Sequence, residues 1–155
     1  MAWAPDLSYY SYNLNRPLKN VFNVGWLDAR HDFDRGRVDP ITIVKIRHII
    51  NRRECRLTRR ACRCGFCAQE SEQTPSNLTD ARLAGSDTAP HSHGEIWVPA
   101  HGGYVFAAPS LIAHFIENHG YRPPEQFLDA VEAFDIDTVF DGDALFRQLT
   151  QLESA

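Results

Sequence analysis

Long apolar runs are missing from this chain. No segment approaches the roughly 20 apolar residues that a membrane-crossing helix needs. The opening "MAWAPDLSYYSYNLNRP" lacks the basic flank and the apolar run of a secretory signal. We therefore expect a cytoplasmic protein with no membrane partner.

Three enzyme signatures are also missing. The sequence contains no Gly-rich phosphate-binding loop, no nucleophile elbow and no "HExxH" pair of zinc-protease histidines. It contains no internal repeat either. The function classes that these motifs mark are excluded, and any catalytic role would have to rest on less specific residues.

Cysteines are few, and their spacing is informative. The chain has four, Cys55, Cys62, Cys64 and Cys67. An even number is compatible with two disulfides, but three of the four lie within the six residues "CRCGFC". The two-residue gap between Cys64 and Cys67 is typical of a metal-binding turn, and in a reducing compartment it favours a metal over a disulfide.

The length and composition predict one domain over residues 1–155. A chain of 155 residues with 43% hydrophobic and 23% charged residues can bury one core. Residues 68–93, "AQESEQTPSNLTDARLAGSDTAPHSH", are poor in large apolar side chains and rich in Ser, Thr, Asp and Pro. This composition predicts a mobile surface loop.

The first half of the chain predicts a strand and a helix. An apolar run at residues 21–27 indicates the strand. Asp39 followed by Pro40 is a helix-start signature, because Asp caps free backbone N–H groups and Pro needs no partner at the first helical position. The expected apolar face of this helix consists of Ile41, Val44, Ile46, His48, Ile49 and Ile50.

The second half predicts a hairpin and three helices. Two short apolar runs flank "AHGG", where paired glycines permit a tight β-turn. Residues 109–120 predict a helix that begins at a proline and ends at Gly120. Further helices are expected after Pro123 and Pro124 and in "GDALFRQLTQLES". The fold class is therefore α+β.

Two pairs of metal-ligand residues have suitable spacing. Zinc prefers four ligands in a tetrahedron, commonly thiolate sulfur and imidazole nitrogen. Cys64 and Cys67 form one pair, and His114 and His119, five residues apart on a predicted helix, form the other. We predict a Cys2His2 zinc site, although the residue types do not distinguish Zn²⁺ from iron. The order of knuckle, hairpin and ligand-bearing helix over residues 62–119 resembles that of treble-clef zinc modules.

Several other residues compete for these roles. Cys62, His91 and His93 are alternative ligands, although loop histidines are more often solvated. The alternative for Cys64 and Cys67 is a pair of free thiols or a redox pair. The alternatives for His114 and His119 are a core histidine and a helix-end cation. If the four preferred residues all bind, the tetrahedron is filled and the metal is structural.

An acid–base site is a further possibility. The polar loop "DARHDFDRG" contains Asp28 and His31, and Glu95 opens a predicted strand. Loops are polar in any case, and Glu95 is equally well explained as a charge at the end of a strand.

Charge is distributed unevenly, although the formal net charge is only -4. Residues 45–63 hold eight Lys or Arg against Glu54, whereas Arg122 and Arg147 are outnumbered after Ser110 by nine acidic residues. The favoured interpretation is that the basic block is solvated or pairs with the acidic part of its own chain. The alternative is a nucleic-acid or other anion-binding surface formed by Arg52, Arg53, Arg56, Arg59 and Arg60.

Several motifs give the chain a family resemblance. They are "DLSYY", "NVGWLD", "CGFC", "GEIWV" and "YVFAAPSLIAHFIENHGYRPPEQFLDAV". On these residues the chain resembles a family of small uncharacterised bacterial proteins, from its N-terminus to about Val131. The resemblance implies a shared fold and no particular activity. The long loop, Cys62 and the acidic C-terminal helix depart from the family pattern.

The function expected from these observations is protein–protein interaction by a zinc-stabilised domain, as a regulator, an accessory factor or an immunity-type protein. Aromatic side chains would supply such a surface, although most are expected in the core or at its edge. They are Tyr9, Tyr10, Tyr12, Trp26, Trp97 and Tyr104. An enzyme that uses the 28–35 loop and a nucleic-acid binder that uses residues 45–63 are the two alternatives.

Overall fold

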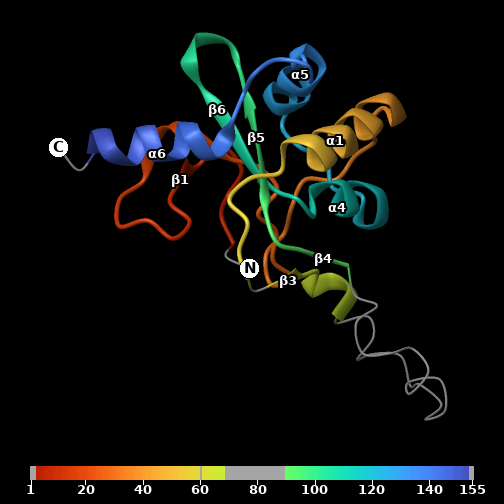
Figure 1. Ribbon diagram of the computed structural model, residues 1–155. Helices are drawn as coiled ribbons and strands as arrows, with labels where there is room; N and C mark the ends of the chain where they lie inside the picture. The colour runs from red at the N-terminus through yellow and green to blue at the C-terminus, as the bar shows by residue number, and fades with distance from the viewer. Residues whose placement is uncertain (1–2, 60, 69–89, 154–155) are drawn as a thin grey trace, which may run out of the picture.

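The computed structural model describes residues 3–59, 61–68 and 90–153. It confirms the mixed α+β class, with helices packed on a four-stranded sheet (Figure 1). Arg60 and residues 69–89, which make up most of the expected surface loop, lie outside the described residues. No helix in the described part of the chain is long and apolar enough to cross a membrane.

The main sheet has the order β1-β2-β6-β5. β1 (Tyr9–Tyr10) pairs antiparallel with β2 (Leu18–Asn23), and β2 pairs parallel with β6 (Val105–Pro109). β5 (Glu95–Pro99) completes the sheet as the antiparallel neighbour of β6. A second, two-stranded sheet joins β3 (Cys62–Arg63) to β4 (His91–Ser92), so the end of the expected loop is extended and paired.

The strand expected at residues 21–27 has different limits. β2 begins at Leu18 and ends at Asn23. The apolar run continues beyond the end of the strand, and its side chains remain buried there. Gly25, with a φ of 75°, interrupts the extended backbone and so ends the strand.

The hairpin prediction is confirmed. β5 and β6 are in register from Glu95 opposite Pro109 to Pro99 opposite Val105. Gly102 and Gly103, in the short 3-10 helix His101–Gly103 between the strands, have φ values of 83° and 80°. Both values lie in the region that glycine adopts without steric cost.

The helix expected after Asp39 is α1 (Pro40–Arg53), and the Asp39 side chain accepts a hydrogen bond from the Ile41 N–H. Its predicted apolar face was wrong in part. Ile41 is 79% exposed and Val44 is 53% exposed, whereas Thr42, Ile46 and Ile49 are buried. The chain has more apolar residues on this helix than one face can bury, and tertiary packing selects the face.

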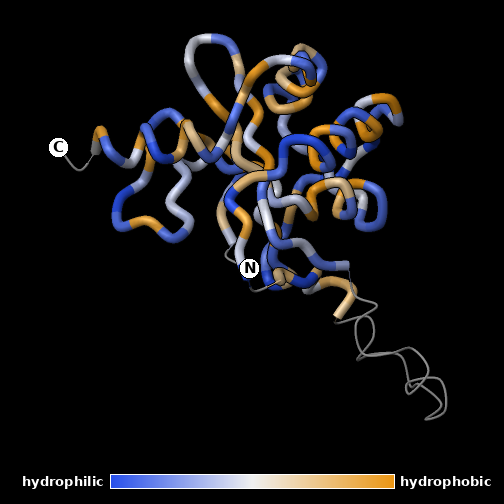
Figure 2. Tube along the Cα trace, viewed as in Figure 1, coloured by the Kyte–Doolittle hydropathy of each residue, from blue (hydrophilic) through white to orange (hydrophobic). Residues whose placement is uncertain are grey.

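The remaining helices follow the predicted order. α4 (Ile112–His119) begins later than expected because Pro109 belongs to β6, and it ends at Gly120, whose φ of 70° and N–H bond to the Phe115 carbonyl form a left-handed cap. α5 (Glu125–Ala133) and α6 (Gly142–Glu153) follow. Hydrophilic and hydrophobic residues alternate along α6 (Figure 2).

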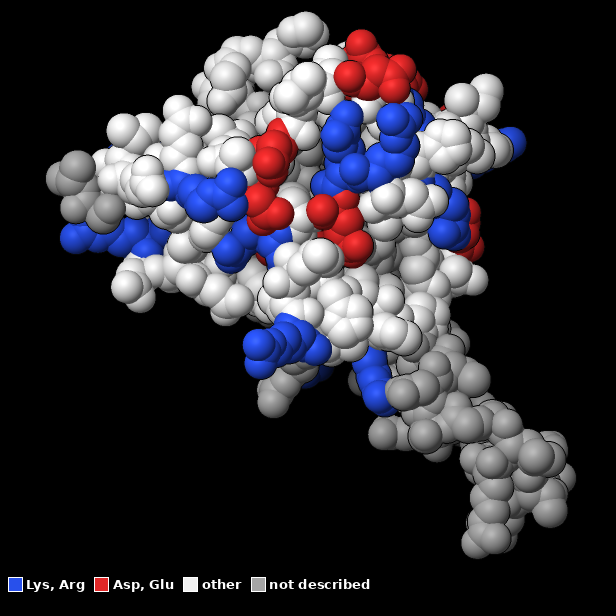
Figure 3. Space-filling view, in the orientation of Figure 1, with Lys and Arg blue, Asp and Glu red and all other residues white. Residues whose placement is uncertain are grey.

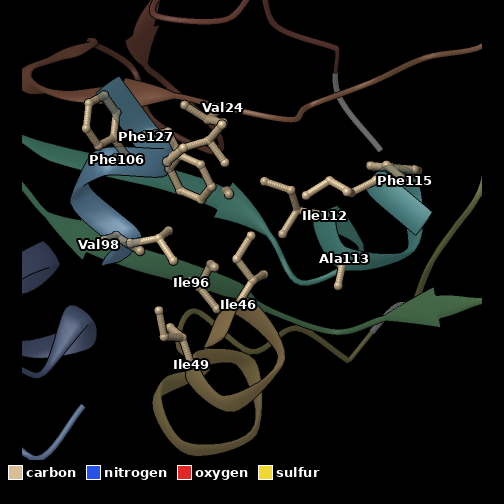
Figure 4. Packing of buried hydrophobic residues seen from close by; sticks show 14 of the residues in the cluster. Val24, Ile46, Ile49, Ile96, Val98, Phe106, Ile112, Ala113, Phe115 and Phe127 are labelled. Carbon is tan, nitrogen blue, oxygen red and sulfur yellow. The ribbon is translucent and has the colours of Figure 1, made fainter. Parts of the chain in front are cut away.

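The two faces of the sheet carry two apolar clusters, since neighbouring residues of a strand point to opposite faces. On one face, Ile96, Val98 and Phe106 pack against α1, α4 and α5 (Figure 4). On the other, Trp97, Val105 and Ala107 join a second cluster, against which side chains of α6 and of the N-terminal segment pack.

Candidate metal centre

Four potential metal ligands lie together at one end of the first apolar cluster. Cys64 and Cys67 come from the segment of residues 61–68, and His114 and His119 come from α4. One ligand atom of each residue lies within 4.8 Å of the ligand atoms of the others. The two pairs predicted from the sequence are therefore brought together by the fold, and the cluster, which we call the Cys/His cluster, could hold a metal ion.

Several donor-atom distances within the Cys/His cluster are close to those of a tetrahedral site. Sγ of Cys64 is 3.3 Å from Nε2 of His119, Sγ of Cys67 is 3.3 Å from Nε2 of His114, and the two Nε2 atoms are 3.2 Å apart. Tetrahedral zinc with ordinary bond lengths places sulfur and nitrogen about 3.6 Å apart and two nitrogens about 3.3 Å apart. The donor atoms therefore already lie close to the positions that one ion requires.

Hydrogen bonds alone do not account for this arrangement. Nε2 of His119 lies within 3.4 Å of three other donor atoms, those of Cys64, Cys67 and His114. An imidazole nitrogen carries either one hydrogen or one lone pair, so it can satisfy one such contact well but not three. A cation shared by all four atoms satisfies each of them.

Local structure explains how each pair is formed. The Cys64 N–H donates to the Pro90 carbonyl at 3.0 Å, and residues 65–68 are helical, so the two thiols lie on one short turn. On the other side, His119 is the last residue of α4, just before the left-handed Gly120. This position near the end of the helix lets a pair five residues apart share one face.

Two neighbours support the cluster. The ring of Phe66, inside the "CGFC" turn, lies 5.0 Å from the His119 ring and 6.0 Å from the Phe115 ring. Nδ2 of Asn118 lies 3.0 Å from Nδ1 of His114. The sequence analysis missed Asn118, although its position four residues after His114 on a helix was a usable signal.

The other predicted ligands lie outside the Cys/His cluster. Cys62 pairs with Ser92 between β3 and β4. Nδ1 of His93 lies 3.1 Å from the Thr58 carbonyl, and the ring of His91 lies 5.8 Å from that of His93. None of these three is among the described residues that gather as potential ligands.

The 28–35 loop does not place its acid–base candidates in the Cys/His cluster. Asp28 accepts hydrogen bonds from the Arg30 side chain and backbone, and these bonds, the side-chain one foremost, hold the pKa of Asp28 below its usual range. His31 stacks on Trp3 with ring centroids 3.8 Å apart. Glu95 lies elsewhere, at the start of β5.

Glu95 is the centre of a second polar cluster, which also contains Tyr10, Trp97 and Arg56. The Tyr10 hydroxyl and the Trp97 indole N–H donate to its carboxylate at 2.8 and 3.0 Å, and Nε of Arg56 lies 3.9 Å away. Glu95 is only 2% exposed. Burial raises its pKa, although the hydrogen bonds and Arg56 act in the opposite direction. We call this group the Glu95 cluster.

A close backbone contact holds Glu95 in place. Cys55 and Glu95 exchange backbone hydrogen bonds of 2.8 and 2.9 Å. A Cβ on Gly94 would lie 2.8 Å from the Cys55 carbonyl oxygen, which explains the glycine of "GEI". Cys55 itself is buried.

Much of the basic block bonds to the acidic part of its own chain (Figure 3). Arg47 pairs with Glu117, and Arg52 pairs with Asp137 at 3.4 Å. Arg53 donates to the carbonyls of residues 136 and 138. Of the predicted anion-binding residues, Arg59 is exposed and Arg56 belongs to the Glu95 cluster.

Comparison with known proteins gives a family match. The family described as "Domain of unknown function (DUF7919)" matches residues 2–132. No curated protein and no solved structure matches the chain. The match contains all four residues of the Cys/His cluster and ends before α6.

Proposed function

The chain belongs to this family of unknown function, and we propose that it binds one zinc ion through Cys64, Cys67, His114 and His119, with the metal in a structural role. The observation that carries the proposal is the approach of four donor atoms, from segments about fifty residues apart, to within 4.8 Å of one another. The description of the family names no activity.

The donor set favours zinc. Two thiolates and two imidazoles are ligands that Zn²⁺ commonly takes in tetrahedral structural sites. Iron also binds sulfur and nitrogen donors and is the second candidate. The separations of 3.2 to 3.4 Å between four pairs of donor atoms suit either ion in a tetrahedral site.

Four protein ligands leave no position for an activated water. Catalytic zinc sites usually have three protein ligands and an open fourth position. A filled tetrahedron instead ties the Cys64–Cys67 turn to the end of α4, and its binding free energy becomes part of the folding free energy. In this proposal residues 62–119 form a treble-clef-like zinc module.

The domain would then act through its surface, as a partner-binding regulator, accessory factor or immunity-type protein. Support comes from a metal centre with a complete ligand set and from exposed aromatic side chains, among them Tyr9 at 52% and Tyr104 at 47% exposed. The nucleic-acid alternative is less favoured because Arg47, Arg52 and Arg53 bond within the chain.

The deciding experiment measures metal per chain by elemental mass spectrometry. The protein is purified without chelator or nickel, as wild type, Cys64→Ser and the control Cys62→Ser. We expect one zinc in the wild type and in Cys62→Ser, and loss of zinc together with cooperative unfolding in Cys64→Ser. No metal in the wild type would overturn the structural role, and an iron signal would overturn the choice of zinc.

A native pulldown with the metal-loaded protein tests the interaction role. One partner that is recovered repeatedly, and that copurifies at a fixed ratio, is the expected result. Recovery of no specific partner from cells that express the protein would count against this part of the proposal and would leave the metal site standing.

A further inference from the structure

A large apolar groove lies between the sheet and α5, apart from the Cys/His cluster. Its volume is about 970 Å³, and its walls come from β1, β2, the β5–β6 hairpin, α5 and the segment that follows α5. Figure 1 shows α5 and the tip of the hairpin at the same end of the molecule. We call this site the hairpin groove.

One wall of the hairpin groove is aromatic. The Phe22 ring lies 5.5 Å from the Tyr9 ring, 5.5 Å from the Tyr104 ring and 6.4 Å from the Phe106 ring. Tyr9 and Tyr104 are about half exposed, at 52% and 47%. A contiguous exposed aromatic surface of this kind marks a binding site more often than a solvated face.

The charged side chains that line the hairpin groove are acidic. Asp129 of α5, Asp135 and the ionisable His101 lie on its wall, and none of the Lys or Arg residues that the structure describes does. Asp129 has no hydrogen-bond or ion-pair partner among the residues that the structure describes, whereas Asp135 accepts from the Asp137 N–H. This differs from Glu117 and Asp137, which pair with Arg47 and Arg52.

We propose that the hairpin groove binds a peptide segment of a protein partner in which an arginine or lysine adjoins an apolar side chain. This inference rests on the proposed interaction function. The apolar side chain would pack on the aromatic wall, and the cation would lie near Asp129 and Asp135, where carboxylates and ring faces both attract it. Phosphate-bearing partners are disfavoured by the same carboxylates.

The size of the groove favours a peptide over a single small cation. Small-molecule pockets usually measure about 300–1,000 Å³ and enclose most of their ligand. This groove reaches the upper end of that range, and its walls come from five segments of the chain. A segment of several residues can contact the aromatic wall and the carboxylates together.

The test begins with peptides displayed on phage and selected on zinc-loaded protein. We expect selected peptides to be enriched in arginine or lysine beside an aliphatic or aromatic residue. Resynthesis with citrulline, a neutral analogue of arginine, should weaken binding about tenfold or more, since the charge-assisted contact is lost. Asp129→Lys should weaken binding similarly, and Tyr104→Ala should also reduce it.

Asp32→Lys is the matched control, because Asp32 is exposed and does not line the groove. The inference is overturned if no such peptides are enriched, if binding persists in Asp129→Lys, or if arginine amide alone binds as tightly as the peptides. It is also overturned if the protein self-associates through the groove, as shown by an Asp129→Lys variant that converts a dimer to a monomer.

The outcomes separate this inference from the function on which it rests. Asp129→Lys should keep one metal per chain and a wild-type unfolding midpoint, because Asp129 is exposed and does not belong to the Cys/His cluster. A partner from the pulldown that binds Asp129→Lys as tightly as wild type would support the interaction role and refute the groove. Absence of zinc binding by the wild type would refute the proposed metal centre. The peptide-binding result would then be assessed on its own.

Discussion

The Cys/His cluster and the Glu95 cluster bury polar groups in opposite ways. In the Cys/His cluster four donor atoms face one another, and Nε2 of His119 has three of them within 3.4 Å. In the Glu95 cluster the carboxylate receives hydrogen bonds from Tyr10 and Trp97 and has Arg56 nearby. The second cluster contains its own cation, whereas the first brings together four groups that could hold a metal ion.

Under the proposed function, the difference predicts which part of the fold depends on an external ion. A buried charge is tolerated when it is paired and hydrogen-bonded, and Glu95 meets both conditions within the chain. In the proposed function, the Cys/His cluster meets them by holding a metal ion. Removing metal should therefore destabilise the structure around the Cys/His cluster and leave the interactions of the Glu95 cluster intact.

The largest expected effect follows removal of the metal. A chelator that competes for zinc, or Cys67→Ser, should lower the free energy of unfolding by roughly 5 kcal/mol or more, because metal binding is coupled to folding. Urea unfolding with and without chelator measures this change. Hydrogen exchange should show lost protection first at residues 61–68 and in α4, and unchanged exchange there would contradict a structural metal.

Arg56→Met tests the Glu95 cluster and should cost about 2 kcal/mol, because it leaves a buried carboxylate without its cation. Arg56 also lies over the Phe146 ring of α6, 3.5 Å from its centroid, so α6 should loosen as well. Urea unfolding of the metal-loaded protein measures the cost. Adding Glu95→Gln to Arg56→Met should restore part of the stability. If Arg56→Met alone is as stable as wild type, Arg56 is not needed to stabilise the buried Glu95.

Asn118→Ala should weaken metal binding about tenfold through His114. When Nε2 of His114 binds a metal, Nδ1 carries the hydrogen, and a half-turn of the Asn118 amide presents an oxygen to accept it. Competition with a coloured zinc chelator measures the affinity. Asn118→Asp keeps an acceptor and should bind nearly as well as wild type; equal loss in both variants would argue against this hydrogen bond.

The smallest expected effect is a pH dependence carried by Glu95. Its folded pKa is raised from 4.5, so its contribution to stability is fully present below about pH 4.5 and is lost as pH rises through the folded pKa. The free energy of unfolding of wild type minus that of Glu95→Gln should therefore fall with rising pH, and the metal contribution cancels in this difference. Denaturant titrations across pH in zinc-saturated buffer measure it, with Asp32→Asn as the exposed control. A difference that rises with pH would contradict the assignment.

Local signals in the sequence were reliable where short-range chemistry decides the structure. Asp39 with Pro40 begins α1, the paired glycines form the hairpin turn, and Gly120 ends α4. The ligand pairs were also recognisable, since a two-residue gap and a helical spacing bring each pair onto one face. These features depend on residues within about five positions of one another.

Features that depend on contacts between distant segments could not be predicted from the sequence in the same way. Ile41 and Val44 suited the buried face of α1 as well as Ile46 and Ile49 did, but α1 packs against α5 and the sheet through the latter. Glu95 had the appearance of a strand-end charge, and only the approach of Tyr10 and Arg56 made it a buried acceptor. The contact of Asn118 depends on the orientation of the His114 ring, which places Nδ1 within 3.0 Å of Nδ2 of Asn118.

The sequence by itself determined the α+β class, the turns and caps, and the two ligand pairs, because each follows from the conformational and chemical preferences of neighbouring residues. Tertiary structure decided that the donor atoms of the two pairs converge to within 4.8 Å. It also decided that the buried Glu95 lies beside Arg56 and that Asp129 lines the aromatic hairpin groove. These arrangements join segments far apart in the chain, and the close packing of the two apolar clusters fixes which of them meet.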